Sequence, residues 1–122
     1  MIIITGGAAI KPEHLAEAVA LGVKHSARSR AEPGCIAHNC HVDAEDANRV
    51  VFVELWTDMA AVQVHFAVPE SGEFVRKLRA MAVGRPEIHL YEATELPSPA
   101  GLTPQQQGAA AFIRELRDTD RY

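Results

Sequence analysis

Hydrophobic residues change their spacing along this chain, and this change constrains the fold more than any other feature. Four short segments are apolar and rich in β-branched residues, which favours strands: 1–10, 35–42, 50–56 and 88–94. Between the first two, and again between the last two, apolar residues recur at helical spacing. The order β-α-β-β-α-β predicts an α+β fold of the ferredoxin-like type, with helices on one face of a four-stranded antiparallel sheet.

Proline and glycine mark the ends of the expected helices. Pro12 suits the first turn of a long amphipathic helix, and Pro33-Gly34 ends it. The inward face of this helix is expected to carry Leu15, Val19, Gly22, Val23 and Ala27.

The second helical region is expected to begin near Met59, after a cap at Thr57 or Asp58. Pro69 breaks it, and a new helical stretch starts at Ser71. Gly84 and Pro86 are expected to end that stretch before the last strand, and its inward side is expected to carry Phe74, Leu78 and Met81.

Length and composition describe one ordinary globular domain with a short addition. The chain has 122 residues, which we divide into a domain at 1–96 and a C-terminal linker with a short helix at 97–122. The net charge is −4 without a basic patch, which argues against nucleic acid as a partner. No apolar run approaches the roughly 18–20 residues that span a membrane, and the first residues do not resemble a signal peptide, so we expect a cytoplasmic protein.

The expected strands are apolar on both faces. Val51, Val53 and Leu55 alternate with Phe52 and Trp56 along one strand, so two apolar surfaces result. Helices cover one of them, and an uncovered apolar sheet face is an interaction site. We therefore predict a homodimer in which the open sheet faces of two copies meet.

A carboxylate and an indole lie on one side of the strand 50–56. Glu54 and Trp56 share their parity with Phe52, so all three project from one face of the sheet. His65, on the following helix, is expected on the inner face of that helix with Val62 and Phe66. A buried glutamate is costly unless it is paired, and a coupled Glu–His pair in an apolar pocket can accept a proton near neutral pH.

Spacing alone does not decide between a catalytic and a structural role for these residues. A histidine on an apolar helix face and a tryptophan at a strand end are more often core residues than catalysts. The strand 35–42 can pair with 50–56 in two registers, one placing His38 beside Glu54 and the other bringing Asn39 to that face. The six histidines show no recognisable metal-ligand spacing, and His25 is expected to be a surface or structural residue.

Several of these residues together resemble the antibiotic biosynthesis monooxygenase (ABM) domain family over about residues 1–96. The similar elements are Glu32-Pro33-Gly34-Cys35, Glu54-Leu55-Trp56, Ala60-Ala61 and the downstream His65, followed by Pro69. The resemblance implies a dimeric α+β barrel.

The resemblance also implies a chemistry. Family members include monooxygenases that oxidise quinols or polyphenols with O₂ and use neither metal nor flavin. His65, assisted by Glu54, would then be the base, and Trp56 with Phe52 would shape an aromatic pocket. His38 stands where the family often has an aromatic residue, and the first strand lacks the asparagine of haem-degrading relatives.

Two other functions fit the same fold. One is a small-molecule isomerase, which calls for cationic side chains near the pocket, and the nearest in sequence are Arg76, Lys77 and Arg79. The other is a non-catalytic ligand-binding or stress protein.

Overall fold

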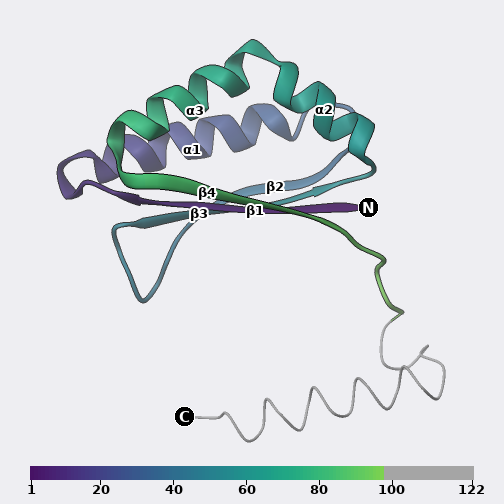
Figure 1. Cartoon of the computed structure of the whole chain (residues 1–122), viewed down its shortest axis with the longest axis horizontal. Coiled ribbons are helices and arrows are strands. Elements are labelled where there is room, and N and C mark those ends of the chain that lie inside the picture. The colour runs from purple at the N-terminus through teal and green to yellow at the C-terminus, as the bar shows by residue number, and fades with distance from the viewer. Residues whose placement is uncertain (98–122) are drawn as a thin grey trace, which may run out of the picture.

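The computed structural model describes residues 1–97, which form one antiparallel sheet with helices packed on one of its faces (Figure 1). The predicted tail helix lies outside the described residues. In chain order, the elements are β1 (Ile2–Ile10), the 3₁₀ turn η1 (Pro12–His14), α1 (Leu15–Ser29), β2 (Cys35–Val42), β3 (Arg49–Trp56), α2 (Met59–Ala67), α3 (Pro69–Met81) and β4 (Ala82–Glu92).

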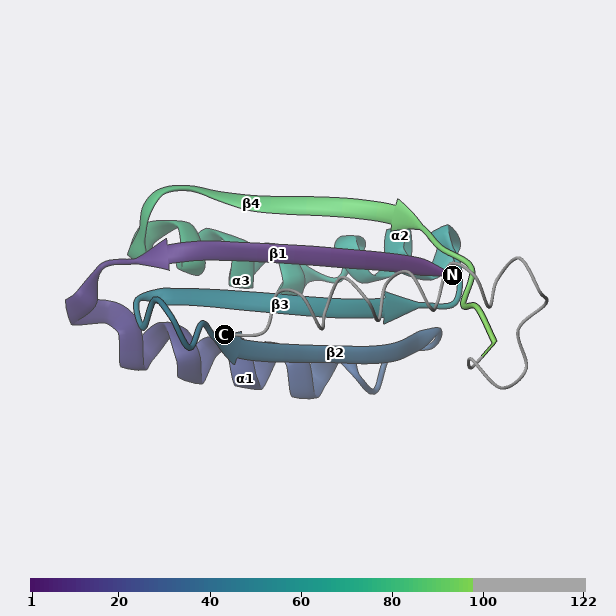
Figure 2. The same cartoon turned by 90° about the horizontal axis from the view of Figure 1, so that it is seen from below.

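The sheet has the order β2-β3-β1-β4, and each neighbouring pair is antiparallel (Figure 2). The two central strands are therefore β1 and β3, and β2 and β4 lie at the edges. This arrangement confirms the predicted ferredoxin-like fold. Figure 2 views the face that the helices leave open.

The second helical region begins as predicted, but it ends and restarts differently from the prediction. The Asp58 carboxylate caps α2 by accepting a hydrogen bond from the Ala61 N–H at 2.8 Å. Pro69 does not separate two helices by a loop; it occupies the first turn of α3, where its missing N–H costs nothing.

The last strand was predicted to begin at residue 88, and this prediction is wrong by six residues. β4 begins at Ala82 and runs through Gly84 and Pro86. Both residues are tolerated because β4 is an edge strand, where a proline can turn its donor-less nitrogen away from the neighbouring strand.

The buried face of α1 also differs from the prediction. Gly22 is buried and Leu15 and Val19 pack against the core as predicted, but Val23 is 53% exposed and Ala27 is exposed as well. The other buried residues of α1 are Ala18, His25, Ser26 and Ser29. Small side chains let α1 lie close to the sheet. At Gly22, a Cβ atom would come within 2.7 Å of Cys40 Sγ and 2.8 Å of Phe52 Cζ.

Within residues 1–97, none of the helices is long and apolar enough to cross a membrane.

Candidate active site

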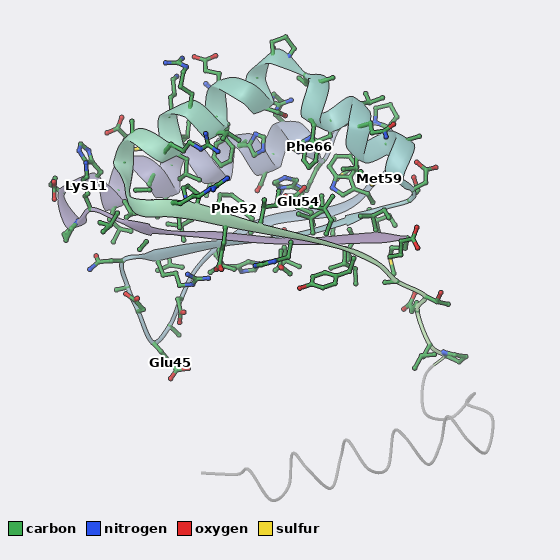
Figure 3. The ribbon with its side chains drawn as sticks, viewed as in Figure 1. Lys11, Glu45, Phe52, Glu54, Met59 and Phe66 are labelled. Carbon is green, nitrogen blue, oxygen red and sulfur yellow. The ribbon has the colours of Figure 1, made fainter. Side chains whose placement is uncertain are left out.

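The strand β3 carries the centre of the candidate site on its helix-facing side. Phe52, Glu54 and Trp56 are all buried there, as their shared parity predicts. Figure 3 labels Phe52 and Glu54 on this side of the sheet. Phe52 belongs to an apolar cluster with Phe74, and Trp56 belongs to a second cluster with Val62. Glu54 thus lies between two apolar regions, in a place where an ionised carboxylate needs partners.

One hydrogen-bond donor and two imidazole nitrogens surround the carboxylate of Glu54. The Trp56 Nε1–H donates to Glu54 Oε1 at 2.9 Å, and the same oxygen lies 3.3 Å from His38 Nε2 and 3.8 Å from His65 Nε2. Burial by itself raises the pKa of Glu54, but His38, Trp56 and His65 together outweigh it, so the pKa falls below its ordinary value. Glu54 is therefore ionised at neutral pH.

His65 is buried and held by a second carboxylate. Its Nδ1 lies 2.9 and 3.1 Å from the two oxygens of Glu32. Because an ionised carboxylate only accepts hydrogen bonds, the neutral ring of His65 carries its proton on Nδ1 and its lone pair on Nε2. That lone pair lies on the side of Glu54, so a proton arriving at Nε2 would lie between two carboxylates.

Glu32 is the main site residue that the sequence reasoning did not single out. It follows α1 in a tight turn, and Arg28 donates to its Oε2 at 3.2 Å. Gly34 makes the turn possible, because its φ is +83° and a Cβ there would come within 2.5 Å of Ala61. In the sequence, Glu32 is marked only by the Glu-Pro-Gly-Cys motif. That motif points to the family, but it does not predict the contact between Glu32 and His65.

The register of β2 against β3 places His38 opposite Glu54. Of the two registers left open by the sequence, this one brings His38 to the site, where its Nδ1 lies 2.8 Å from Ser26 Oγ. Asn39 consequently lies on the open face of the sheet, and its prediction as a substrate-binding residue is corrected by this register.

His25 joins the same cluster from α1, although it was expected to be a surface or structural residue. Its ring stacks on Phe74 with the centroids 3.9 Å apart and the planes 5° from parallel. Burial, and then the neighbouring His38, His65 and Arg28, together lower the pKa of His25 from 6.5 to about 3, against a smaller upward effect of Glu54. His25 is therefore neutral in the folded protein.

The remaining predicted pocket residues divide into two groups. Val62 is fully buried beside Trp56, and Phe52 is buried near His38. Phe66 is 46% exposed, so its prediction as an inward pocket residue is wrong. The physical reason is helix geometry, because His65 takes the inward direction and the next residue is turned by about 100°.

A cleft of about 120 Å³ opens between α1 and α3 and reaches this cluster through His25 and Phe74. Its rim is charged, with Arg28 and Lys77 among the lining residues. This volume is well below the roughly 300–1,000 Å³ of a typical ligand pocket. A ligand of ordinary drug size does not fit the cleft as it stands.

Comparisons with known proteins support the fold and the family. The family model described as "Antibiotic biosynthesis monooxygenase" matches residues 1–77. An uncharacterized protein of Synechocystis, sll1783, is 34% identical over 94 residues, which are 77% of this chain and 64% of that protein. This chain thus matches less than two thirds of the relative's length.

Two solved structures extend the similarity to three dimensions. A crystal structure of an antibiotic biosynthesis monooxygenase is 28% identical, has a TM-score of 0.72 and is matched over 78% of this chain and 100% of its own. A candidate antibiotic biosynthesis monooxygenase from Deinococcus radiodurans is 26% identical, with a TM-score of 0.76 and coverage of 80% and 97%. The chain belongs to the antibiotic biosynthesis monooxygenase family.

Proposed function

We propose that this protein is a monooxygenase that oxidises an electron-rich quinol or polyphenol with O₂, and that His65 accepts the phenolic proton. The observation that carries the proposal is the pairing of His65 Nδ1 with Glu32, which leaves Nε2 as a free base beside Glu54. A base inside an apolar enclosure turns a phenol into a phenolate, which is a far better electron donor to oxygen.

The electron balance needs no external reductant. A quinol that becomes a hydroxyquinone loses two hydrogen atoms and gains one oxygen atom, which supplies all four electrons that O₂ requires, and the second oxygen atom leaves as water. The protein's tasks are then to remove the proton, to stabilise the imidazolium that forms, and to exclude water from the anion. Glu32 and Glu54 stabilise the imidazolium, and Trp56 and Val62 exclude water.

Isomerisation of a small anionic substrate is less well supported. Such a reaction calls for a cation free to bind the anion. Arg28, which contacts the ring of His25, is bound to Glu32 and Ser71, while Lys77 on the rim of the cleft is paired with Glu73 at 3.1 Å.

We propose further that the protein is a homodimer through the open sheet face. Strand register places Ile3, Leu55 and Tyr91 side by side on that face, and Val51 and Val53 lie on the same side of β3. Val53 is 37% exposed and Tyr91 is 53% exposed. A two-fold axis brings the same apolar face of two copies together, so each copy covers the exposed apolar side chains of the other.

Oxygen uptake tests the proposed reaction. Wild-type protein and the His65→Ala variant are compared on a panel of hydroquinones and polyphenols, with His14→Ala as the control because His14 lies on the 3₁₀ turn and pairs with the exposed Glu17. Loss of the base should lower the rate by about 10²–10⁴-fold. Equal uptake by wild type and His65→Ala would refute the role of His65.

A further inference from the structure

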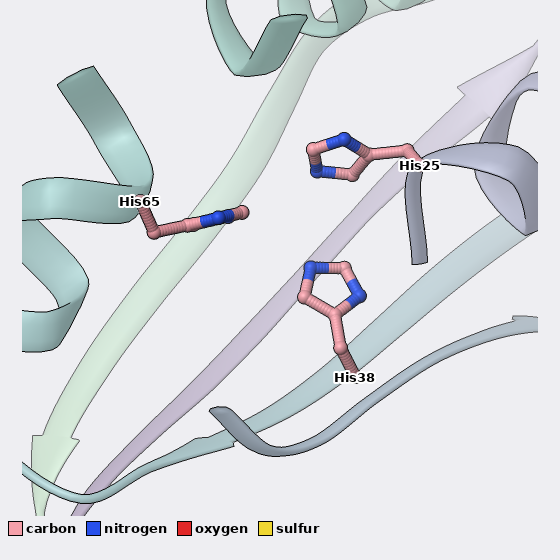
Figure 4. Close-up of side chains that lie close together, drawn as sticks. All are labelled: His25, His38 and His65. Atoms are coloured by element: carbon pink, nitrogen blue, oxygen red, sulfur yellow. The ribbon is translucent and has the colours of Figure 1, made fainter. Parts of the chain in front are cut away.

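Three buried histidines from three different elements converge in the core. His25 comes from α1, His38 from β2 and His65 from α2, and the three rings face one another (Figure 4). Their ring centroids are 5.1, 5.5 and 5.5 Å apart, and one nitrogen from each ring lies within 4.8 Å of the other two. A core that needed only apolar packing would not place three imidazoles here.

Each of the three rings is held from outside by its Nδ1 atom. The Nδ1 of His38 contacts Ser26 Oγ at 2.8 Å, and the Nδ1 of His65 contacts Glu32 at 2.9 Å. The Nδ1 of His25 accepts from Arg28 at 3.1 Å. Metal-binding histidines usually donate their outer N–H to such a partner, and Ser26 and Glu32 can accept it from His38 and His65, whereas Arg28 cannot accept it from His25.

The inner nitrogens are poorly satisfied. Among the described residues, His38 Nε2 is buried without a well-formed hydrogen bond, and Glu54 Oε1 lies 3.3 Å from it. His65 Nε2 lies 3.8 Å from the same oxygen. A buried, unpaired nitrogen next to an ionised carboxylate indicates that a cationic partner belongs between them.

We propose that His25, His38 and His65 bind a divalent transition-metal ion of the Zn²⁺, Co²⁺ or Ni²⁺ class, with Glu54 as a fourth ligand. Three imidazoles and one carboxylate suit these ions, whereas Mg²⁺ and Ca²⁺ prefer oxygen ligands. With metal–nitrogen distances of about 2.0–2.1 Å, tetrahedral ligands lie about 3.3 Å apart. The rings must therefore close in by roughly an ångström from their present separation.

Only His25 requires a rearrangement of its proton. Because Arg28 can only donate a hydrogen bond to Nδ1, the proton of neutral His25 is on Nε2. If Nε2 binds the metal ion, this proton must move to Nδ1. Arg28 must then release this one contact, and it keeps its hydrogen bonds to Glu32 and Ser71.

This inference goes beyond the proposed oxidation. A metal ion on Nε2 of His65 would occupy the lone pair that the proposed base uses. The metal-bound and metal-free proteins are thus two distinct states, and only the metal-free state has the free base.

Titration with Co²⁺ alone tests the site. The full chain, without an affinity tag and freed of metal by a chelator, should bind one equivalent with the visible d–d bands of a tetrahedral ion, and Zn²⁺ should displace it. The His25→Gln variant should bind at least about 100-fold more weakly, because loss of a ligand costs more than loss of an outer contact. The matched His14→Gln control should bind as the wild type does.

Nuclear magnetic resonance of the histidine ring nitrogens in wild-type protein gives a second readout that needs no variant. Zn²⁺ should shift the signals of His25, His38 and His65 and leave those of His14, His41 and His89 in place. No binding, equal binding by His25→Gln, or an intense thiolate band from Cys35 or Cys40 would overturn the proposal. These measurements use neither substrate nor oxygen. Their outcome for the metal site is therefore independent of whether the proposed oxidation is correct.

Discussion

His65 Nδ1 lies 2.9 Å from Oε1 of Glu32, a residue 33 positions earlier in the chain. This contact joins α2 to the turn after α1 and fixes the tautomer of the imidazole, because a carboxylate can only accept. The consequence is a free Nε2 inside the core. Much of the proposed chemistry depends on this one pair.

Replacing Glu32 by glutamine should therefore lower the oxidation rate without removing the base. A glutamine amide can donate to Nδ1, which moves the ring proton to Nε2 and blocks the lone pair. We expect a fall of about 10–100-fold in oxygen uptake with a quinol that wild-type protein turns over. The control is Glu17→Gln, which replaces an exposed carboxylate paired with His14. Unchanged uptake by Glu32→Gln would show that the tautomer does not matter.

Acid should destabilise the metal-free protein through His25. The unfolded chain takes up a proton near pH 6.5, whereas the pKa of folded His25 is about 3, so stability falls as the pH falls between these values. In the presence of a chelator, the free energy of unfolding should decrease by about 2 kcal/mol from pH 7 to pH 5. The lowered pKa of Glu54 acts only below about pH 4.5, so it does not contribute to this window.

The His25→Phe variant should remove most of that pH dependence. A phenyl ring can keep the stacking on Phe74 but cannot bind a proton. Urea unfolding at pH 7 and pH 5 measures the difference, and His14→Gln should retain the wild-type slope. A slope for His25→Phe as steep as that of wild type would assign the effect to another group.

Two glycine substitutions should change stability in opposite directions. Gly22→Ala places a Cβ within 2.7 Å of Cys40 Sγ, so it should destabilise the protein by about 1–3 kcal/mol. Gly72→Ala, within α3, meets nothing within 4 Å and should stabilise by about 0.5–1 kcal/mol. Chemical denaturation of both variants measures the pair, and a neutral Gly22→Ala would contradict the close approach of α1 to the sheet.

A charge at the centre of the open sheet face should prevent dimerisation. Val53→Lys places an ammonium among Ile3, Leu55 and their copies in the second subunit. Sedimentation or light scattering should show a wild-type dimer and a monomeric variant. The control is Val64→Lys, on the exposed side of α2. A monomeric wild type, or a variant that remains dimeric, would contradict the proposed interface.

The sequence predicted those features that depend on local periodicity. The strand parity of Glu54 and Trp56 and the order of the elements follow from residues close together in the chain, and both are confirmed. The inward face of α1 was predicted correctly at Leu15, Val19 and Gly22 but not at its other buried residues, because these are small or polar and leave no apolar signal. β4 was also predicted too short. Gly84 and Pro86 were interpreted as the end of the preceding helix, whereas they lie within the edge strand itself.

The site itself depends on contacts between distant segments. The sequence could not decide the register that brings His38 to Glu54, since a shift by one residue would have exchanged His38 for Asn39. Nor could it pair Glu32 with His65, because that pair requires the turn after α1 to reach α2. The convergence of the three histidines has the same origin.

Anaerobic mixing tests the role of His65 as proton acceptor most directly. Metal-free protein is mixed without oxygen with a phenolic substrate whose anion absorbs in the visible range. Wild-type protein should develop the phenolate spectrum with one equivalent bound per chain, and His65→Ala should bind the neutral phenol without that spectrum. A phenolate signal of equal size in both proteins would contradict the role of His65 as the base.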